Sequence, residues 1–219
     1  MHPYHHALSS QAIHGGETSN YLGIHEWFDQ SKATLAFCTH RALRHHREGV
    51  QCAQRKFGTT LYNSDARPVS VQNVCEQHLD EDCRRIPEVK DWLSCMQTPE
   101  WLPTKLVNPE DLAEREAKRL GVETIQIIDI CKWFSETSEW FDDFRHLAMR
   151  NHSFGIFEAE DVFGSVRQIN EIIIPIRYLG ERVVRANMGR IPTPADWLRK
   201  IRAKPWMVRA KNPGEVLGL

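Results

Sequence analysis

The chain has 219 residues, 41% of them hydrophobic, and its 28 basic and 29 acidic side chains leave a formal net charge of −1. This balance creates no global field that would attract nucleic acid or an anionic membrane surface, so neither partner is expected. No apolar run is long enough to cross a membrane and no charged-then-apolar leader opens the chain, which together predict a cytoplasmic protein.

The first hundred residues predict helices joined by short turns and one hairpin. Pro3 suits the first turn of a helix, and Gly15 and Gly16 end that helix. The predicted elements are helices over 3–14, 18–35 and 40–57, a hairpin over 59–71, and helices over 74–83 and 88–96. A stretch rich in proline, 98–107, is expected to be a linker.

The segment 40–58 then recurs as 146–164, and the register between the copies runs without a gap from 2–58 onto 108–164. After a one-residue deletion in the second copy it continues to Trp101, which lies on Trp206. This duplication predicts a mainly α protein of two tandem, pseudo-symmetric units of about 100 residues, each with a small β-hairpin. The expected boundaries are 1–102, 103–207 and a tail over 208–219.

Five residues of the predicted helix 40–57 share one face and recur in the second copy: Ala42, His46, Gly49, Ala53 and Phe57. The small residues among them would allow close helix contact. His46 and its counterpart His152 are expected to be buried imidazoles with hydrogen-bonded nitrogens, with a metal or catalytic role as the alternative.

His40 and Arg44 lie one helical turn apart on a different face and also recur. They are candidates for an anion or carboxylate anchor, since an arginine with a neighbouring histidine can bind a phosphate or carboxylate. The alternative is an internal carboxylate that anchors a loop, for which Glu76 and Glu181 are the repeated candidates.

Several motifs together resemble a known group of proteins. They are the opening His2-Pro-Tyr-His-His-Ala7, the run His40-Arg-Ala-Leu-Arg-His-His46, the turn Asn63-Ser-Asp65, the triplet Glu76-Gln-His78, and Ile-Pro, Asp-Trp-Leu and Pro-Trp between 191 and 206. The sequence is similar to a family of short, uncharacterised bacterial and phage proteins of about one unit in length. This resemblance implies a common origin and fold for the two copies, and no particular chemistry.

Nine of the 11 histidines lie in the first copy. Those without a histidine counterpart in the second are His2, His5, His6, His14, His25, His45 and His78. A set of imidazoles lost together is expected when a duplicated site decays in one copy. Neutral imidazoles with nearby carboxylates suit Zn²⁺, Mn²⁺ or Fe²⁺. The predicted metal donors are His5, His6, His45 and His78, with Asp65 or Glu76 completing or orienting the set.

No known catalytic spacing accompanies these histidines. The chain lacks His-Glu-x-x-His, a His-Asp dipeptide, a P-loop, a Gly-x-Ser-x-Gly elbow and any Cys-x-x-Cys pair. The six cysteines also find no counterparts between the copies, which favours reduced thiols.

Two hypotheses follow. The first is a non-enzymatic pseudo-dimer that binds a protein or small molecule, for example as a phage-encoded effector or inhibitor. The second is a metal-dependent hydrolase of a phosphorylated or nucleotide-like substrate, with its site in the first copy.

Overall fold

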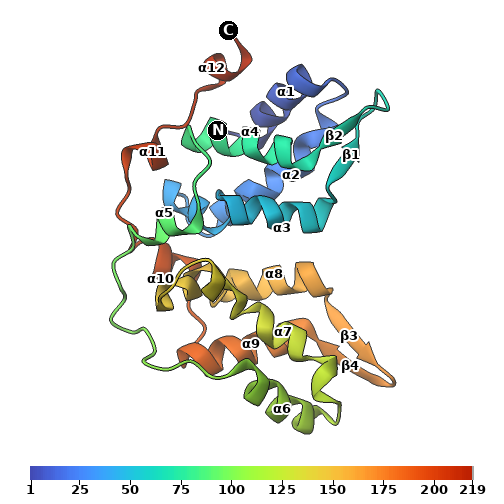
Figure 1. Cartoon of the computed structure of the whole chain (residues 1–219), viewed down its shortest axis with the longest axis vertical. Coiled ribbons are helices and arrows are strands. Elements are labelled where there is room, and N and C mark those ends of the chain that lie inside the picture. The colour runs from blue at the N-terminus through green and yellow to red at the C-terminus, as the bar shows by residue number, and fades with distance from the viewer. Residues whose placement is uncertain (219) are drawn as a thin grey trace. The chain divides into compact units, whose positions relative to one another are not determined.

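The computed structural model describes residues 1–218 and contains helices and two antiparallel hairpins (Figure 1). The chain forms two compact units: unit 1 comprises Met1–Cys95 and Ile201–Leu219, and unit 2 comprises Met96–Lys200. Within 1–218, no helix combines the length and the apolar character needed to span a bilayer.

Unit 1 is a small helical body with a hairpin between its third and fourth α-helices. Its elements are α1 (Pro3–His14), α2 (Ser19–Asp29), η1 (Gln30–Ala33), η2 (Cys38–Leu43), α3 (Arg47–Phe57), β1 (Thr60–Tyr62), β2 (Pro68–Ser70), α4 (Val71–Cys83), α5 (Val89–Leu93), α11 (Pro205–Val208) and α12 (Pro213–Leu217). Its core gathers apolar residues of α1, α2, α3 and α4 around Tyr21 and Phe28, both fully buried.

Unit 2 repeats the order of elements from α1 to α5, with one additional 3₁₀ helix, η3, before its second α-helix. Its elements are α6 (Pro109–Leu120), η3 (Thr124–Gln126), α7 (Ile128–Trp133), η4 (Glu136–Glu139), η5 (Phe144–Met149), α8 (Ser153–Phe163), β3 (Val166–Ile169), β4 (Ile172–Pro175), α9 (Ile176–Met188) and α10 (Pro194–Leu198). The prediction of a mainly helical chain with a small hairpin in each copy is therefore confirmed.

The predicted helix from His40 to Phe57 is wrong in its first half. Residues Cys38–Leu43 form the 3₁₀ helix η2, and α3 begins only at Arg47. The reason is His46, which has extended backbone angles and caps α3 by accepting a hydrogen bond from the Gly49 N–H at Nδ1, 2.9 Å away. His152 caps α8 in the same way through Gly155. As expected, both imidazoles are buried and hydrogen-bonded.

Gly49 and Gly155 are required by this cap. A Cβ atom on Gly49 would lie 1.9 Å from the Arg44 carbonyl oxygen, and one on Gly155 would lie 1.9 Å from that of Arg150. The close approach is between a helix start and the turn before it. These glycines therefore allow the chain to turn tightly into the helix, and the prediction that they allow close contact between two helices is wrong.

The ends of the two sequence copies are exchanged between the structural units. Trp92 of the first copy packs on Trp206 of the second, with ring centroids 4.6 Å apart. Trp197 of the second copy packs on Trp101 of the first, also at 4.6 Å. Each unit thus contains the same tryptophan pair, with one member supplied by the other copy.

The last residues, expected to be a tail, pack on unit 1. The helix α12 contacts α1, and the backbone N–H of Lys211 donates to the Glu81 carbonyl at 2.7 Å. Arg84 donates to both carboxylate oxygens of Glu215, at 2.8 and 3.0 Å. The structural boundaries at 95/96 and 200/201 therefore differ from the predicted sequence boundaries.

Candidate metal centre

Four buried side chains of unit 1 converge from three segments. Asp29 is the last residue of α2, His45 precedes the cap of α3, and His78 and Asp82 lie one turn apart on α4. One donor atom from each lies within 4.8 Å of the others. The spacing i, i+4 on α4 brings His78 and Asp82 onto one face of that helix.

The donor separations match a small coordination sphere. His45 Nε2 lies 3.0 Å from His78 Nε2 and 3.2 Å from Asp82 Oδ2. His78 Nε2 is 3.8 Å from the same Oδ2, and Asp29 Oδ1 is 3.7 Å from His45 Nε2. A tetrahedral ion with donors at about 2.0–2.2 Å requires donor separations of roughly 3.3–3.6 Å, which these values bracket.

The second carboxylate oxygen of Asp82 is already occupied. Oδ1 lies 3.1 Å from Arg41 Nη2 and 3.0 Å from the α-amino group of Met1. Burial alone would raise the pKa of Asp82, but hydrogen bonds from His45 and His6 and the charge of Arg41 hold this pKa well below its usual range. The carboxylate is therefore ionised. The positive charges of Arg41 and the α-amino group beside Oδ1 disfavour a second metal ion on that side.

Both imidazoles of the set are held neutral. Burial lowers the pKa of His45 despite the neighbouring Asp82, and burial together with the charge of His6 holds the pKa of His78 well below its usual value. A neutral imidazole is the form that binds a metal, because the lone pair of one nitrogen is free.

Two polar atoms of the cluster are buried without a hydrogen-bond partner in the described chain: Asp29 Oδ2 and His45 Nδ1. Asp29 is only 7% exposed. A buried polar atom without a partner costs about 1–3 kcal/mol, and a charged one costs more. Asp29 Oδ1 lies 3.7 Å from His45 Nε2, and within residues 1–218 this carboxylate forms no ion pair with an arginine or a lysine.

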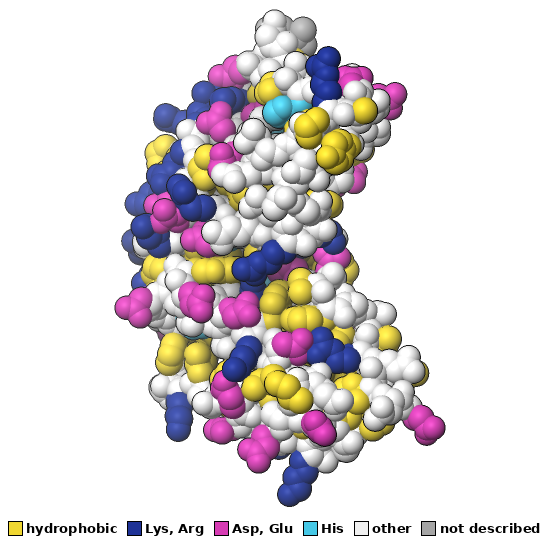
Figure 2. All heavy atoms as spheres, turned by 45° about the vertical axis from the view of Figure 1, so that its right-hand side comes forward, with side chains coloured by type: hydrophobic (Ala, Val, Ile, Leu, Met, Phe, Trp, Pro, Cys, Tyr) yellow, Lys and Arg dark blue, Asp and Glu magenta, His cyan; other side chains and the backbone are white. Residues whose placement is uncertain are grey.

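His6 and Glu81 lie next to the donors. Glu81 accepts from His6 Nδ1 at 2.5 Å, and His6 Nε2 lies 3.5 Å from Asp82 Oδ1. Burial alone would lower the pKa of His6, but its hydrogen bonds with Asp82 and Glu81 raise it. On the face drawn in Figure 2, histidine occupies little of the surface despite its abundance, which agrees with the burial of most histidine side chains.

Unit 2 lacks this cluster at every donor position. Its counterparts of Asp29, His45, His78 and Asp82 are Ser135, Asn151, Val183 and Asn187. The Asn187 side chain donates to Asn151 Oδ1 at 3.0 Å, and Asn151 donates to the Phe134 carbonyl. The same backbone positions thus hold neutral amides where unit 1 holds an imidazole and a carboxylate.

Of the six predicted metal donors, the structure brings three together. His45 and His78 supply two of the four donors, and the ring centroid of His6 lies 4.1 Å from that of His78. The neighbouring His5 has ring contacts with His2 and Tyr4 instead.

The two predicted carboxylates lie elsewhere in unit 1. Asp65 accepts a hydrogen bond from the Gly16 N–H at 2.8 Å, in the turn between β1 and β2. Glu76 accepts from the Gln72 side chain at 2.7 Å. The carboxylates that the structure places at the cluster are Asp29 and Asp82.

His40 and Arg44 hold the loop before α3. Arg44 stacks on Trp27, 4.1 Å from the ring centroid, and donates to the Trp27 carbonyl and to Gln30. The hydroxyl of Ser31 lies 3.2 Å from His40 Nδ1. Glu76, proposed as an internal partner, pairs with Gln72 instead.

Unit 2 builds the same anchor. Arg150 stacks on Trp133, 4.0 Å from the ring centroid, and donates to the Trp133 carbonyl and to Glu136. Thr137 lies 2.9 Å from His146 Nδ1. These recurring contacts indicate a loop anchor that both copies need for folding.

Sequence reasoning missed Asp29, Asp82 and the role of His25. Asp29 faces Ser135 and Asp82 faces Asn187 in the same register as the lost histidines. The loss of a carboxylate at both positions is the signal in the sequence that indicates them.

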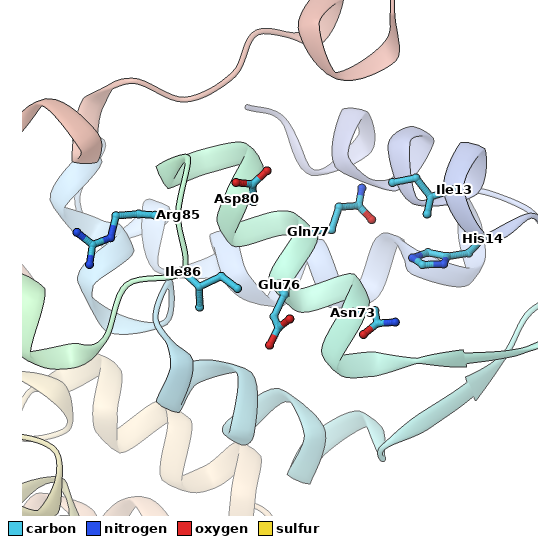
Figure 3. Close-up of a pocket in the computed structure, with 8 residues that line it drawn as sticks. All are labelled: Ile13, His14, Asn73, Glu76, Gln77, Asp80, Arg85 and Ile86. Carbon is cyan, nitrogen blue, oxygen red and sulfur yellow. The ribbon is translucent and has the colours of Figure 1, made fainter.

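A shallow pocket of about 560 Å³ lies over α1, α4 and the segment after α4, lined by Ile13, His14, Asn73, Glu76, Gln77, Asp80, Arg85 and Ile86. Figure 3 shows Gln77 projecting from α4 on the side of α1. Gln77 also donates to Glu81 at 2.8 Å, so the pocket wall is bonded to the residues around the donors.

All six cysteines are free thiols outside the donor set. Burial raises the pKa of Cys83 and of Cys131 to about 12, which keeps these thiols protonated and unreactive at neutral pH.

The profile of one protein family, described as a domain of unknown function (DUF6915), matches the chain twice, over residues 1–102 and 107–207. The two matches coincide with the tandem copies. Neither the curated proteins nor the solved structures include a match to the chain.

Proposed function

We propose that this chain, which belongs to the family defined by the domain of unknown function DUF6915, binds one divalent transition-metal ion in unit 1. The donors are Asp29, His45, His78 and Asp82. Two imidazole nitrogens and two carboxylate oxygens suit Zn²⁺, Mn²⁺ or Fe²⁺.

The observation that carries the proposal is the convergence of these four buried donors around Asp29, whose carboxylate lacks a hydrogen-bond partner at Oδ2 within the described residues. An isolated buried carboxylate is costly unless it is paired or coordinates a metal. Asp82, by comparison, has Arg41 on its far side and directs Oδ2 toward the two imidazoles.

Unit 2 supports the same conclusion. It keeps the loop anchor and the imidazole cap, which the fold needs, and replaces the four donors with Ser135, Asn151, Val183 and Asn187. A cluster needed only for folding would be expected in both copies, since α1 to α5 and α6 to α10 follow the same order apart from η3.

A binding role is better supported than hydrolysis. A metal-dependent hydrolase of a phosphorylated or nucleotide-like substrate needs a coordination position open to substrate or water. Four protein donors that are at most 7% exposed form a closed set, which is typical of structural metal sites.

The exchanged ends support a second proposal, that the chain is a fused form of a dimer and presents a surface to a protein or small-molecule partner. Exchange of identical elements is a common route from monomers to dimers. The pairs Trp92–Trp206 and Trp101–Trp197 are what such an exchange would leave after the two copies became joined in one chain.

Metal analysis of the untagged full chain tests the first proposal. After incubation with Zn²⁺, Mn²⁺ or Fe²⁺ and removal of free ion, we expect one ion per chain. The matched variant is His45→Asn with Asp82→Asn, which installs the amide pair of unit 2. This double variant should fold, as followed by circular dichroism, and bind no ion.

Bound metal should also raise the unfolding temperature of the wild type, because a ligand at 100 times its dissociation constant stabilises by about 2.7 kcal/mol. The double variant should show no such rise. Wild-type protein that binds none of the three ions, or a double variant that binds as tightly as the wild type, contradicts the proposal.

A further inference from the structure

A row of hydrogen bonds runs from the metal donor His78 to the wall of the surface pocket. His78 Nδ1 lies 3.0 Å from His25 Nδ1, and His25 Nε2 lies 2.9 Å from the Ser10 hydroxyl. Ser10 donates to Gln77 Oε1 at 2.9 Å, and Gln77 Nε2 donates to Glu81 at 2.8 Å. Except for Gln77, which also lines the pocket (Figure 3), these residues are buried.

The donor and the acceptor of every hydrogen bond in this row can be assigned by starting from its last residue, Glu81. The Glu81 carboxylate accepts hydrogen bonds from the Ser9 hydroxyl and from Gln77, so Gln77 must present its NH₂ group to Glu81 and its oxygen to Ser10. Ser10 therefore donates its hydroxyl proton to Gln77 and can only accept from His25. His25 thus carries its proton on Nε2.

The same logic then assigns the tautomer of His78. A neutral His25 protonated on Nε2 has a lone pair on Nδ1, so its partner His78 must donate from Nδ1. Both rings are fully buried, where the neutral imidazole is the less costly form. The lone pair of His78 then lies on Nε2, the nitrogen that faces His45 and Asp82.

We infer that His25, Ser10 and Gln77 are positioning residues that hold His78 with Nε2 free to bind the metal ion. This inference rests on the proposed metal site. In metal centres the second nitrogen of a histidine ligand usually donates to such a partner, and removal of the partner typically weakens metal binding by about 10–100-fold.

Unit 2 has replaced the row as a whole. The counterparts of Ser10, His25, Gln77, His78 and Glu81 are Glu116, Cys131, Arg182, Val183 and Ala186. Where Ser10 donates to Gln77 in unit 1, Arg182 donates to Glu116 at 2.8 and 3.0 Å in unit 2. The unit without metal donors thus also lacks the residues that would orient one.

Two neighbouring serines provide a matched test. Ser10→Ala removes a member of the row, whereas Ser9→Ala removes only a hydroxyl that donates to Glu81 at 2.7 Å. Both serines are buried on α1. We expect Ser10→Ala to weaken Zn²⁺ binding by about 10–100-fold in competition with a chelator, and Ser9→Ala to change it far less. Gln77→Met, of similar shape, should weaken binding in the same direction if Ser10→Ala does not fold.

The second measurement is made on metal-free protein. Nitrogen-15 chemical shifts of the imidazoles should show His78 protonated on Nδ1 and His25 on Nε2, with the single tautomer of His25 lost in Ser10→Ala. A His78 protonated on Nε2, or equal Zn²⁺ affinities for the two serine variants, overturns the inference. Correct tautomers in a protein that binds no ion would instead overturn the metal site and leave the assigned row intact.

Discussion

Units 1 and 2 share a scaffold and differ in what they bury inside it. Both begin their central α-helix with an imidazole cap, and both stack an arginine on a tryptophan in the preceding loop. Unit 1 adds charged and imidazole groups at positions where unit 2 has Leu112, Val183 and an amide pair. Residues kept by both copies therefore report on folding, and residues kept by one copy report on a site.

The largest effect is expected where the two units agree. Gly49→Ala and Gly155→Ala should each destabilise by about 3 kcal/mol or more, because the new Cβ would meet a carbonyl oxygen at 1.9 Å. Chemical denaturation of each variant measures the change. Gly23→Ala is the control, since nothing lies within 4 Å of its Cβ position in α2. If only one of the two substitutions lowers the free energy of unfolding, the imidazole cap is not equally important in the two units.

The next largest effect is a loss of stability at low pH, which can be measured through His152 in unit 2. His152 accepts from the Gly155 N–H at Nδ1 and donates to the Ala148 carbonyl from Nε2, so it must stay neutral. Burial lowers its pKa to about 4. Between pH 6.5 and 4 the unfolded chain binds this proton and the folded chain does not, so stability falls as the pH falls, by roughly 3 kcal/mol across the window.

The variant His152→Asn tests this titration, because asparagine keeps a capping side chain and cannot take up the proton. Its free energy of unfolding should vary less between pH 6.5 and 4 than that of the wild type. An unchanged pH dependence would assign the acid sensitivity to other groups, such as His146, whose pKa burial also lowers to about 4.

The smallest effect concerns the C-terminal residues, which have no counterpart in unit 2. Arg84→Ala removes both hydrogen bonds to Glu215 and the one to the Arg209 carbonyl, and should cost about 1 kcal/mol, the upper end for exposed ion pairs. Hydrogen exchange should rise near 209 and at the amides of 212–217. The control is Arg177→Ala, which removes a similar exposed pair with Glu160 in unit 2. Equal exchange in 212–217 for both variants would show that α12 is held by other contacts.

Much of the fold could be predicted because it depends on local signals. Pro3 and Gly15 bound α1 as expected, and Gly58 and Gly164 end α3 and α8. The error over 40–57 has a local cause too. A histidine cap is uncommon, so a helical spacing that ran through His46 concealed the start of α3 at Arg47.

The duplication, the helical character and the restriction of the unusual histidines to the first copy can all be predicted from the chain alone, because repeats and residue losses are visible in one dimension. Which histidines meet depends on how the helices pack. Adjacent residues on a helix point about 100° apart, so His6 turns toward His78 while His5 lies beside His2 and Tyr4.

The two donor carboxylates and the exchanged ends likewise depended on the path of the chain. Asp29 and Asp82 are 53 residues apart and meet because α2 packs on α4. Trp206 reaches Trp92 because the chain from Ile201 onward returns to unit 1. Sequence spacing specifies the direction of a side chain on its own element, whereas the packing of elements specifies what that side chain meets.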